Sequence, residues 1–381
     1  MLPRTPAVPS AWAPKPPEEL PLPTPAQLDL LRAALLPAPA AARAWARWGE
    51  RGLRLGTTDR ASRRLLGQLH HNHRAAGVGP EDVARLRASG HRTFAHNTTV
   101  LRASLPAVQL LEQAGMPVVL LKGAAVLALT GGIGRRPITD VDVLVPEHEG
   151  RRAIDLLLQA GWRSHSEGPP RADSSCHGWN FVDGDGGSLD LHWWCYRTAG
   201  SDAGVIRDAR SAQLLGTPVT VPSPADLLLT TVVNGFGPLQ AAPVRWIADS
   251  VVLLGLEADA VDWDTLVARA RERDVTLPAA EGLEYLATRF GAPVPPATLT
   301  ALRATPVALR TRLYHRSVMS PPRRAPVLVP ELEAHRRRRL HDPEHTPWDF
   351  PRHFAQQAGA GTVRHLIWRS LTGALRPGDR R

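Results

Sequence analysis

Apolar residues recur at spacings of three and four through most of the first 115 residues, which is the period of an amphipathic helix. Proline and glycine interrupt this pattern near residues 37, 77–80 and 115, as is typical of helix ends. We therefore predict a helical region of three or four helices over residues 25–115. The preceding residues 1–24 are rich in proline and are expected to form a disordered arm.

Between residues 116 and 200 the pattern changes to short apolar runs of strand type. An amphipathic helical stretch and Gly-rich segments separate these runs, and the last two flank a turn at Asp183–Gly187, as in a β-hairpin. The pattern predicts an α+β core with a small mixed sheet. The expected strands are Val118–Leu121, Val141–Val145, Trp162–His165, His177–Val182 and Ser188–Trp194.

Helical periodicity returns in residues 201–320, after a short segment at residues 217–224 that is expected to be a strand or an extended linker. From residue 321 the chain is rich in proline and arginine, with four arginines in a row before Leu340. Such a run is usually solvated. We expect a second helical domain over 201–320 and a tail over 321–381 that ends in a helix near residues 362–371.

The composition excludes a membrane protein and gives only weak support for nucleic-acid binding. No run approaches the ~20 apolar residues of a membrane span, and prolines near the N-terminus do not suit a signal peptide, so we expect a cytoplasmic protein. The net charge is +10, but Lys15 and Lys122 are the only lysines among 46 basic residues. Arginine enrichment along the whole chain leaves a nucleic-acid partner open.

The candidate chemistry centres on Lys122, Asp140 and Asp142. Alternation along a strand places Asp140 and Asp142 on one face, about 6.7 Å apart. Two neighbouring carboxylates repel each other, and a divalent cation between them removes that cost. Lys122 and Gly123 follow the first expected strand, where a turn into a helix would direct backbone N–H groups at a phosphate.

A third carboxylate is expected from an adjacent strand, because a pair of divalent cations needs a cluster of acids. Asp190 is the best candidate, since Ser188, Asp190 and His192 share one strand face while the leucines between them point the other way. Asp183 and Asp185 compete for this role. They occupy a Gly-rich turn, and turn chemistry explains them better.

Several motifs in this order and spacing resemble the poorly characterised nucleotidyltransferases of the DNA polymerase β superfamily. The resemblance covers roughly residues 90–260 and implies a polymerase-β-like core. It also implies metal-dependent transfer of a nucleoside monophosphate from a triphosphate, with ATP the expected donor and Mg²⁺ or Mn²⁺ the cofactor. The motifs are Leu121–Ala124, the pair Arg135 and Arg136, Thr139–Val145, Leu189–Trp194, Val221–Leu229 and Val244–Asp249.

The resemblance also implies roles for individual residues. Asp140, Asp142 and Asp190 would hold metal, and Asp190 could act as general base on the attacking hydroxyl. The triphosphate would contact Lys122, the N–H groups from Gly123 through Ala124 to Ala125, and Arg135 or Arg136. Ala124 departs from the superfamily, which usually has serine here. His192 would orient Asp190, contact substrate or simply end the strand.

The helix that carries Arg245 and Asp249 would face the cleft and contact nucleotide or acceptor, although two residues four apart also fit an ordinary surface ion pair. At Asn234 the related pattern prefers histidine, which leaves the role of that position open. The acceptor also stays open: a small-molecule hydroxyl, a protein side chain and an RNA end all fit a cleft beside the sheet.

Two other functions compete with this interpretation. One is a non-catalytic module that binds nucleotide or RNA on a degenerate nucleotidyltransferase fold. The other is a glycosyltransferase, because Asp-x-Asp at a strand end also binds a metal with a nucleotide-sugar diphosphate.

Cysteine and histidine offer two weaker metal sites. The expected hairpin brings Cys176, Cys195, His177 and His192 near one another, but the spacing matches no established zinc pattern, and we expect buried, unligated cysteines. His70 and His73 have no carboxylate at a ligand spacing and are expected to be solvated or packed.

Overall fold

The structure is a computed structural model, and it describes residues 22–165, 170, 172, 177–196, 200–235 and 243–319, with seven scattered residues between 332 and 351. The expected arm, Cys176, most of the tail and the helix expected near residues 362–371 lie outside the described residues. The described part has an α+β fold with one small mixed sheet, which confirms the predicted fold class.

The N-terminal region is helical, as predicted, but it is divided more finely than the periodicity indicated. Thr24 caps the first helix by accepting a hydrogen bond from the N–H of Gln27. Asn72 separates two short helices because its side chain donates to the carbonyls of Ala33 and Leu36. The helices are α1 (Pro25–Leu35), α2 (Ala40–Glu50), α3 (Arg60–Arg63), α4 (Leu66–His71), α5 (His73–Ala76) and α6 (Pro80–Gln113).

The five-stranded sheet has the order β1-β2-β5-β4-β3, and only the β2–β5 pair is parallel. Gly178 pairs with His192, so the hairpin expected around Asp183–Gly187 is confirmed. Asp183 closes the turn by accepting hydrogen bonds from the N–H groups of Asp185 and Gly187. The strands are β1 (Val119–Leu120), β2 (Val141–Leu144), β3 (Arg163–Ser164), β4 (Gly178–Val182) and β5 (Ser188–His192).

Beside this sheet lie helices α7 (Lys122–Thr130), α8 (Gly150–Gln159) and α9 (Ala203–Arg207). A separate hairpin of β6 (Arg210–Leu214) and β7 (Thr217–Val221) follows. The sequence indicated β7 as a strand or linker, whereas β6 was not predicted. β6 alternates polar and small residues without a run of large apolar side chains, and its pairing with β7 makes it a strand.

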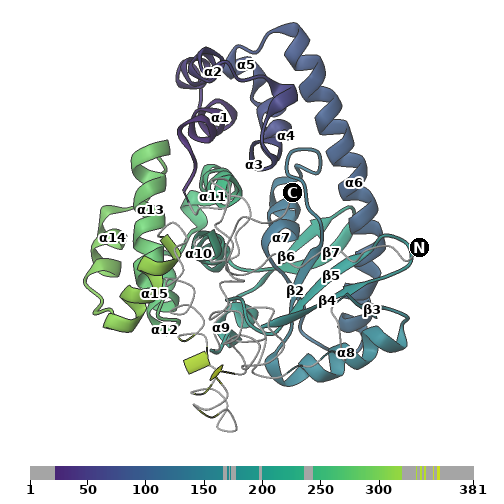
Figure 1. Ribbon diagram of the computed structural model, residues 1–381. Helices are drawn as coiled ribbons and strands as arrows, with labels where there is room; N and C mark the ends of the chain where they lie inside the picture. Colours follow the sequence, from purple (N-terminus) through teal and green to yellow (C-terminus); the bar gives the residue numbers. More distant parts are fainter. Residues whose placement is uncertain are drawn as a thin grey trace, which may run out of the picture.

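The C-terminal helices pack against the N-terminal helices. In Figure 1, α10 and α11 lie between the sheet on one side and helices α13 and α14 on the other. One apolar core joins residues of α1–α6, such as Leu30 and Leu86, to residues of the C-terminal helices, such as Leu228 and Leu283. These helices are α10 (Pro224–Gly235), α11 (Pro243–Glu257), α12 (Trp263–Glu272), α13 (Thr276–Phe290), α14 (Pro296–Arg303) and α15 (Leu309–Met319).

A second core lies between the sheet and helices α6, α7 and α8. Val141 and Val143 of β2 are fully buried in it together with Leu189 and Leu191 of β5. Because side chains alternate along a strand, the residues between these apolar positions point to the opposite face. The long helix α6 contributes to both cores and thereby fixes the sheet relative to the helical region.

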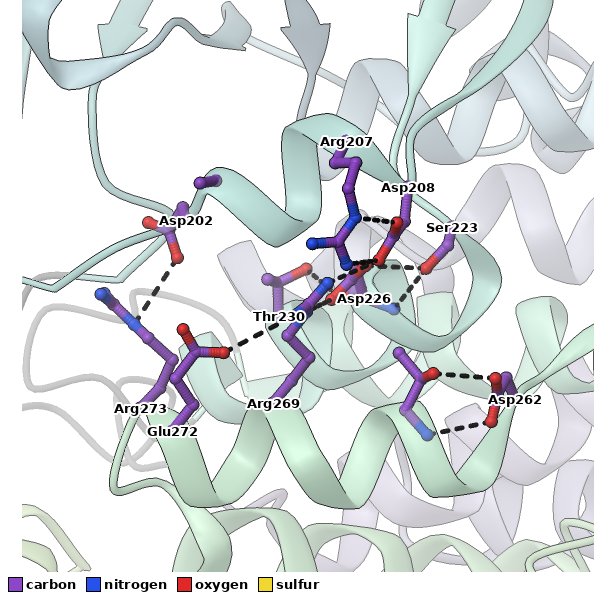
Figure 2. A network of polar contacts seen from close by, with 12 residues as sticks. Asp202, Arg207, Asp208, Ser223, Asp226, Thr230, Asp262, Arg269, Glu272 and Arg273 are labelled. Atoms are coloured by element: carbon purple, nitrogen blue, oxygen red, sulfur yellow. Dashed lines mark hydrogen bonds and ion pairs between the residues drawn. The ribbon is translucent and has the colours of Figure 1, made fainter.

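A polar network on α12 fixes the segment that leaves the end of β5 (Figure 2). The Nε atom of Arg269 lies 3.3 Å from the carboxylate of Asp226, which is almost fully buried. One terminal nitrogen of the same guanidinium lies 2.6 Å from the carboxylate of Asp208. One turn later, Arg273 lies 3.5 Å from Asp202, whose carboxylate accepts a hydrogen bond from the N–H of Cys195. Buried charges are tolerated when paired in this way, and the network ties the end of β5 to the C-terminal helices.

Within the described residues, no helix combines the length and the apolar character that crossing a membrane requires.

Candidate functional site

The parallel pairing of β2 with β5 places Asp142 directly opposite Asp190. Both side chains point away from the apolar core, because their strand neighbours are buried leucines and valines. Asp142 is 5% exposed, while the side chain of Asp190 keeps 20% exposure. Two carboxylates from different segments therefore meet at one edge of a cleft, as expected from the sequence.

Lys122 provides the positive charge beside these acids. Its ammonium donates a hydrogen bond to Asp142 Oδ1 and lies 3.8 Å from Asp190 Oδ2. Burial by itself lowers the pKa of Lys122, but Asp142 and Asp190 outweigh burial and hold that pKa above its usual value. Burial has the opposite effect on Asp142 and raises its pKa. Lys122 and His192 outweigh burial here as well and hold the pKa of Asp142 far below its ordinary range. The pair is therefore ionised at neutral pH.

The backbone of Lys122 adopts a φ of +45°, in the left-handed region. A residue with a Cβ atom pays about 1–2 kcal/mol there, and such strained positions cluster at functional sites. The next residue must be glycine, Gly123, for a different reason. A Cβ atom at Gly123 would collide with the guanidinium of Arg136 and lie 2.8 Å from Ile138. This turn therefore brings the lysine to the acids and lets an arginine pack against the backbone.

His192 lies beneath the acids and is 1% exposed. Its Nε2 atom is 2.9 Å from Asp190 Oδ2 and 3.1 Å from Asp142 Oδ1. Burial and the nearby Lys122 ammonium lower the pKa of His192, yet Asp190 and Asp142 more than compensate, and the net shift is upward. The protonated ring would donate from Nε2 to the acids, whereas a neutral ring with Nε2 unprotonated would accept from the Lys122 ammonium at 3.2 Å or bind a cation. Of the three roles considered for His192, the geometry favours orientation of the carboxylates.

Asp140 immediately precedes β2 and lines the same cleft. Its Oδ1 atom accepts a hydrogen bond of 3.1 Å from the hydroxyl of Thr139. Burial, followed by repulsion from Asp142 and Asp190, raises the pKa of Asp140. The three acids therefore face one another closely enough to interact electrostatically, which is the situation that a bound cation would relieve.

Arg136 forms the second ion pair of the site. Its Nε atom donates to both carboxylate oxygens of Asp249, at 2.8 and 3.0 Å. Asp249 lies on α11 and is 8% exposed. The alternative in which Asp249 pairs with Arg245 on the surface of the helix is therefore wrong, because a buried partner from the loop before β2 reaches it instead.

These side chains surround a cleft of about 230 Å³ between the sheet and helices α10 and α11. Asn234 also lines the cleft, and its side-chain amide donates to the carbonyl of Cys195. Of the expected binding residues, Ala124 is fully buried and Arg135 lines neighbouring cavities instead. The candidate residues that line the cleft are Lys122, Gly123, Arg136, Asp140, Asp142, Asp190, Arg245 and Asp249.

The donor atoms of Asp142, Asp190 and His192 lie within 4.8 Å of one another, as in a metal site. Two carboxylates with one imidazole suit Mn²⁺, and with water ligands also Mg²⁺. The residues therefore fit a divalent cation. Asp140 lies outside this group of three, so its role as a ligand stays a prediction. Among the described residues no other cluster of this kind occurs, so the histidines near His70 do not form one.

The comparison with protein families decides the assignment. Residues 60–291 match the model of a family described as uncharacterised nucleotidyltransferase. The chain belongs to this family. The match covers more than half of the sequence and includes Lys122, all three acids and the helix that carries Asp249. Membership confirms the family resemblance and the assignment as a nucleotidyltransferase, and it favours that function over a glycosyltransferase.

Among solved structures, a crystal structure of ANT(2″)-Ia in complex with adenylyl-2″-tobramycin is 18% identical, with a TM-score of 0.32, over 44% of this chain and 94% of that one. A solution structure of ANT(2″)-Ia is 17% identical, with a TM-score of 0.32, over 50% and 95%. An antigenic nucleotidyltransferase-like protein from Paracoccidioides brasiliensis is 16% identical, with a TM-score of 0.34, over 56% and 94%. These low scores establish no common substrate. No curated protein matches the chain.

Asn97 on α6 is a residue of the site that sequence reasoning missed. It is fully buried, and its amide donates to the carbonyls of Ile133 and Arg136 at 2.6 and 2.8 Å. Its carbonyl accepts from the N–H of Ile138 at 3.0 Å. These three bonds hold the loop that carries Arg136. The available signal was a polar residue at an apolar position of a helix, which is too common to single out a residue.

We predict that Asn97→Ala weakens triphosphate binding without removing any group from the cleft. Two carbonyls and one N–H would lose their buried partners, at a cost of about 1–3 kcal/mol each, and the loop with Arg136 would loosen. Thermal unfolding and calorimetric titration with a triphosphate measure the two effects. Gln109→Ala removes an exposed amide from the same helix and should change neither. Tighter or equal binding by Asn97→Ala would contradict a positioning role.

Proposed function

We propose that this chain transfers a nucleoside monophosphate from a nucleoside triphosphate, with ATP the expected donor, to a hydroxyl group of an acceptor. The reaction would depend on Mg²⁺ or Mn²⁺ held by Asp142 and Asp190, with Asp140 completing the site. The observation that carries this proposal is the in-register pairing of Asp142 with Asp190 beside Lys122 in one cleft.

The arrangement separates the tasks that nucleotidyl transfer requires. Lys122 and Arg136 line the cleft beside the acids and supply positive charge for the phosphates. The missing side chain at Gly123 leaves room for the Arg136 guanidinium to lie against the backbone of this turn. Asp142 and Asp190, with Asp140, would hold the divalent cation, whose charge would neutralise the charge that develops on the transferred phosphate.

Asp190 is the group assigned to the acceptor. Its side chain is more exposed than that of Asp142, and His192 holds one of its oxygens at 2.9 Å. A carboxylate that is fixed on one side and open on the other can accept a proton from an attacking hydroxyl. Asp142, which is bound by both Lys122 and His192, is better suited to hold charge than to move a proton.

The first prediction separates the two acids. Asp142→Asn should weaken triphosphate binding in the presence of Mn²⁺, because a neutral amide cannot share its charge with a cation. Asp190→Asn should retain appreciable affinity and lose turnover, measured as pyrophosphate release at saturating triphosphate. Asp185→Asn, an exposed turn carboxylate on the same hairpin, is the matched control. Equal binding of triphosphate by the parent protein with cation and with chelator would contradict the metal assignment.

The second prediction concerns Lys122. Lys122→Ala should weaken triphosphate binding by about 1.5–3 kcal/mol, the range for a charge-assisted hydrogen bond. Lys122→Arg should rescue binding only in part, because a planar fork does not replace a compact ammonium beside the tight turn. Lys122→Gly should bind as weakly as Lys122→Ala but fold more stably, since glycine adopts the positive φ without strain. Full activity of Lys122→Ala would remove this residue from the phosphate site.

A further inference from the structure

A second cavity of about 40 Å³ adjoins the active cleft on the side of the N-terminal helices. The two cavities share Arg136, Arg245 and Asp249 as lining residues. The second cavity also reaches Arg64, which ends helix α3 in the N-terminal region. It therefore lies where the N-terminal helices, the loop before β2 and helix α11 meet.

The charges around this cavity do not balance. Its lining includes four arginines, and Asp249 is the single carboxylate among the described lining residues. Asp249 is already bound by Arg136. The side chains of Arg64, Arg135 and Arg245 form no ion pair or hydrogen bond with the described part of the chain. Arg64 and Arg245, which are close enough for their charges to interact, thus line one small space without a counter-charge bound to them.

This arrangement is costly for the protein alone. Burial lowers the pKa of Arg245 to about 10, and repulsion from Arg136 and Arg64 lowers it further, against a smaller opposing effect of Asp249 and Asp140. Burial also lowers the pKa of Arg64, and Arg60 and Arg136 lower it further, while Asp140 raises it by less. A charge that is removed from water is stabilised by a partner of opposite charge. An anion in the cavity would supply it and would relieve the repulsion between the arginines.

We propose that Arg64 and Arg245 bind a phosphate group of a ligand whose reacting part lies at Asp142 and Asp190. The second half of this statement rests on the proposed function, whereas phosphate binding by the arginines does not. Guanidinium groups bind phosphate through paired N–H donors, and the charges of two of them match a dianion. By volume the cavity holds roughly three water molecules, so it suits a small anionic group and excludes a nucleoside.

The phosphate can have two sources, which are the end of the triphosphate chain or a phosphate carried by the acceptor. The cleft and the cavity meet at Arg136 and Arg245, so either ligand could extend from one into the other. A phosphorylated acceptor would explain why the N-terminal helices contribute Arg64 to a site otherwise built from the sheet and α11.

The test uses inorganic phosphate as a probe with the full chain in a chelating buffer, measured by calorimetry. Arg64→Gln and Arg245→Gln should each weaken phosphate binding about tenfold or more. Arg92→Gln, which removes an exposed arginine of α6, should bind phosphate like the parent. Lys122→Ala should keep this phosphate binding while it loses triphosphate affinity, so failure of the proposed function and failure of this site can be told apart.

Thermal unfolding with and without phosphate distinguishes arginines that bind phosphate from arginines that only stabilise the fold. Without phosphate, Arg64→Gln and Arg245→Gln should be as stable as the parent or more stable, because repulsion is relieved. Added phosphate should raise the melting temperature of the parent and Arg92→Gln, and barely change that of the two variants. Phosphate affinity in both variants equal to that of Arg92→Gln would overturn the site.

A competition experiment identifies the source of the phosphate. The parent protein is saturated with Mn²⁺ and a non-hydrolysable triphosphate analogue and then titrated with inorganic phosphate. If the Arg64-dependent binding of inorganic phosphate is lost, the end of the triphosphate occupies the cavity. Persistence of that binding shows a separate subsite and assigns the phosphate to the acceptor.

Discussion

The parallel pairing of β2 with β5 is the constraint on which the site depends. It places Asp142 opposite Asp190, and two neighbouring carboxylates, one buried and one partly buried, are costly unless positive charge lies beside them. Lys122 and His192 supply it in this structure. The rest of the fold maintains this arrangement. Apolar residues of both strands bury their opposite face against α6 and α8, and α12 fixes the chain that leaves β5.

The sequence predicted this part of the molecule well because the relevant signals are local. Strand alternation in residues 188–192 placed Asp190 and His192 on one face, and the Gly-rich turn before them fixed the hairpin register. Lys122 was conspicuous because almost every other basic residue of this chain is an arginine. The family resemblance joined these segments into one site, which periodicity alone could not do.

Other features depend on contacts between distant segments, and no local pattern encodes them. Arg136 pairs with Asp249 across more than one hundred residues, whereas spacing on the helix suggested Arg245 as the partner. Asn97 holds the arginine loop from a helix that ends before the sheet begins. Strand β6 exists because β7 pairs with it. The common helical core of the N- and C-terminal regions likewise required the three-dimensional structure.

The central claim is that the acids and Lys122 serve transfer of a nucleotidyl group. It is tested most directly by ATP labelled either at the α-phosphate or at the γ-phosphate. The full chain is incubated with each form, Mg²⁺ or Mn²⁺, and small-molecule, RNA or protein acceptors. The account predicts that the α-label enters an acceptor while the γ-label appears only in pyrophosphate. Transfer of the γ-label to an acceptor, with the α-label left in ADP, would contradict it.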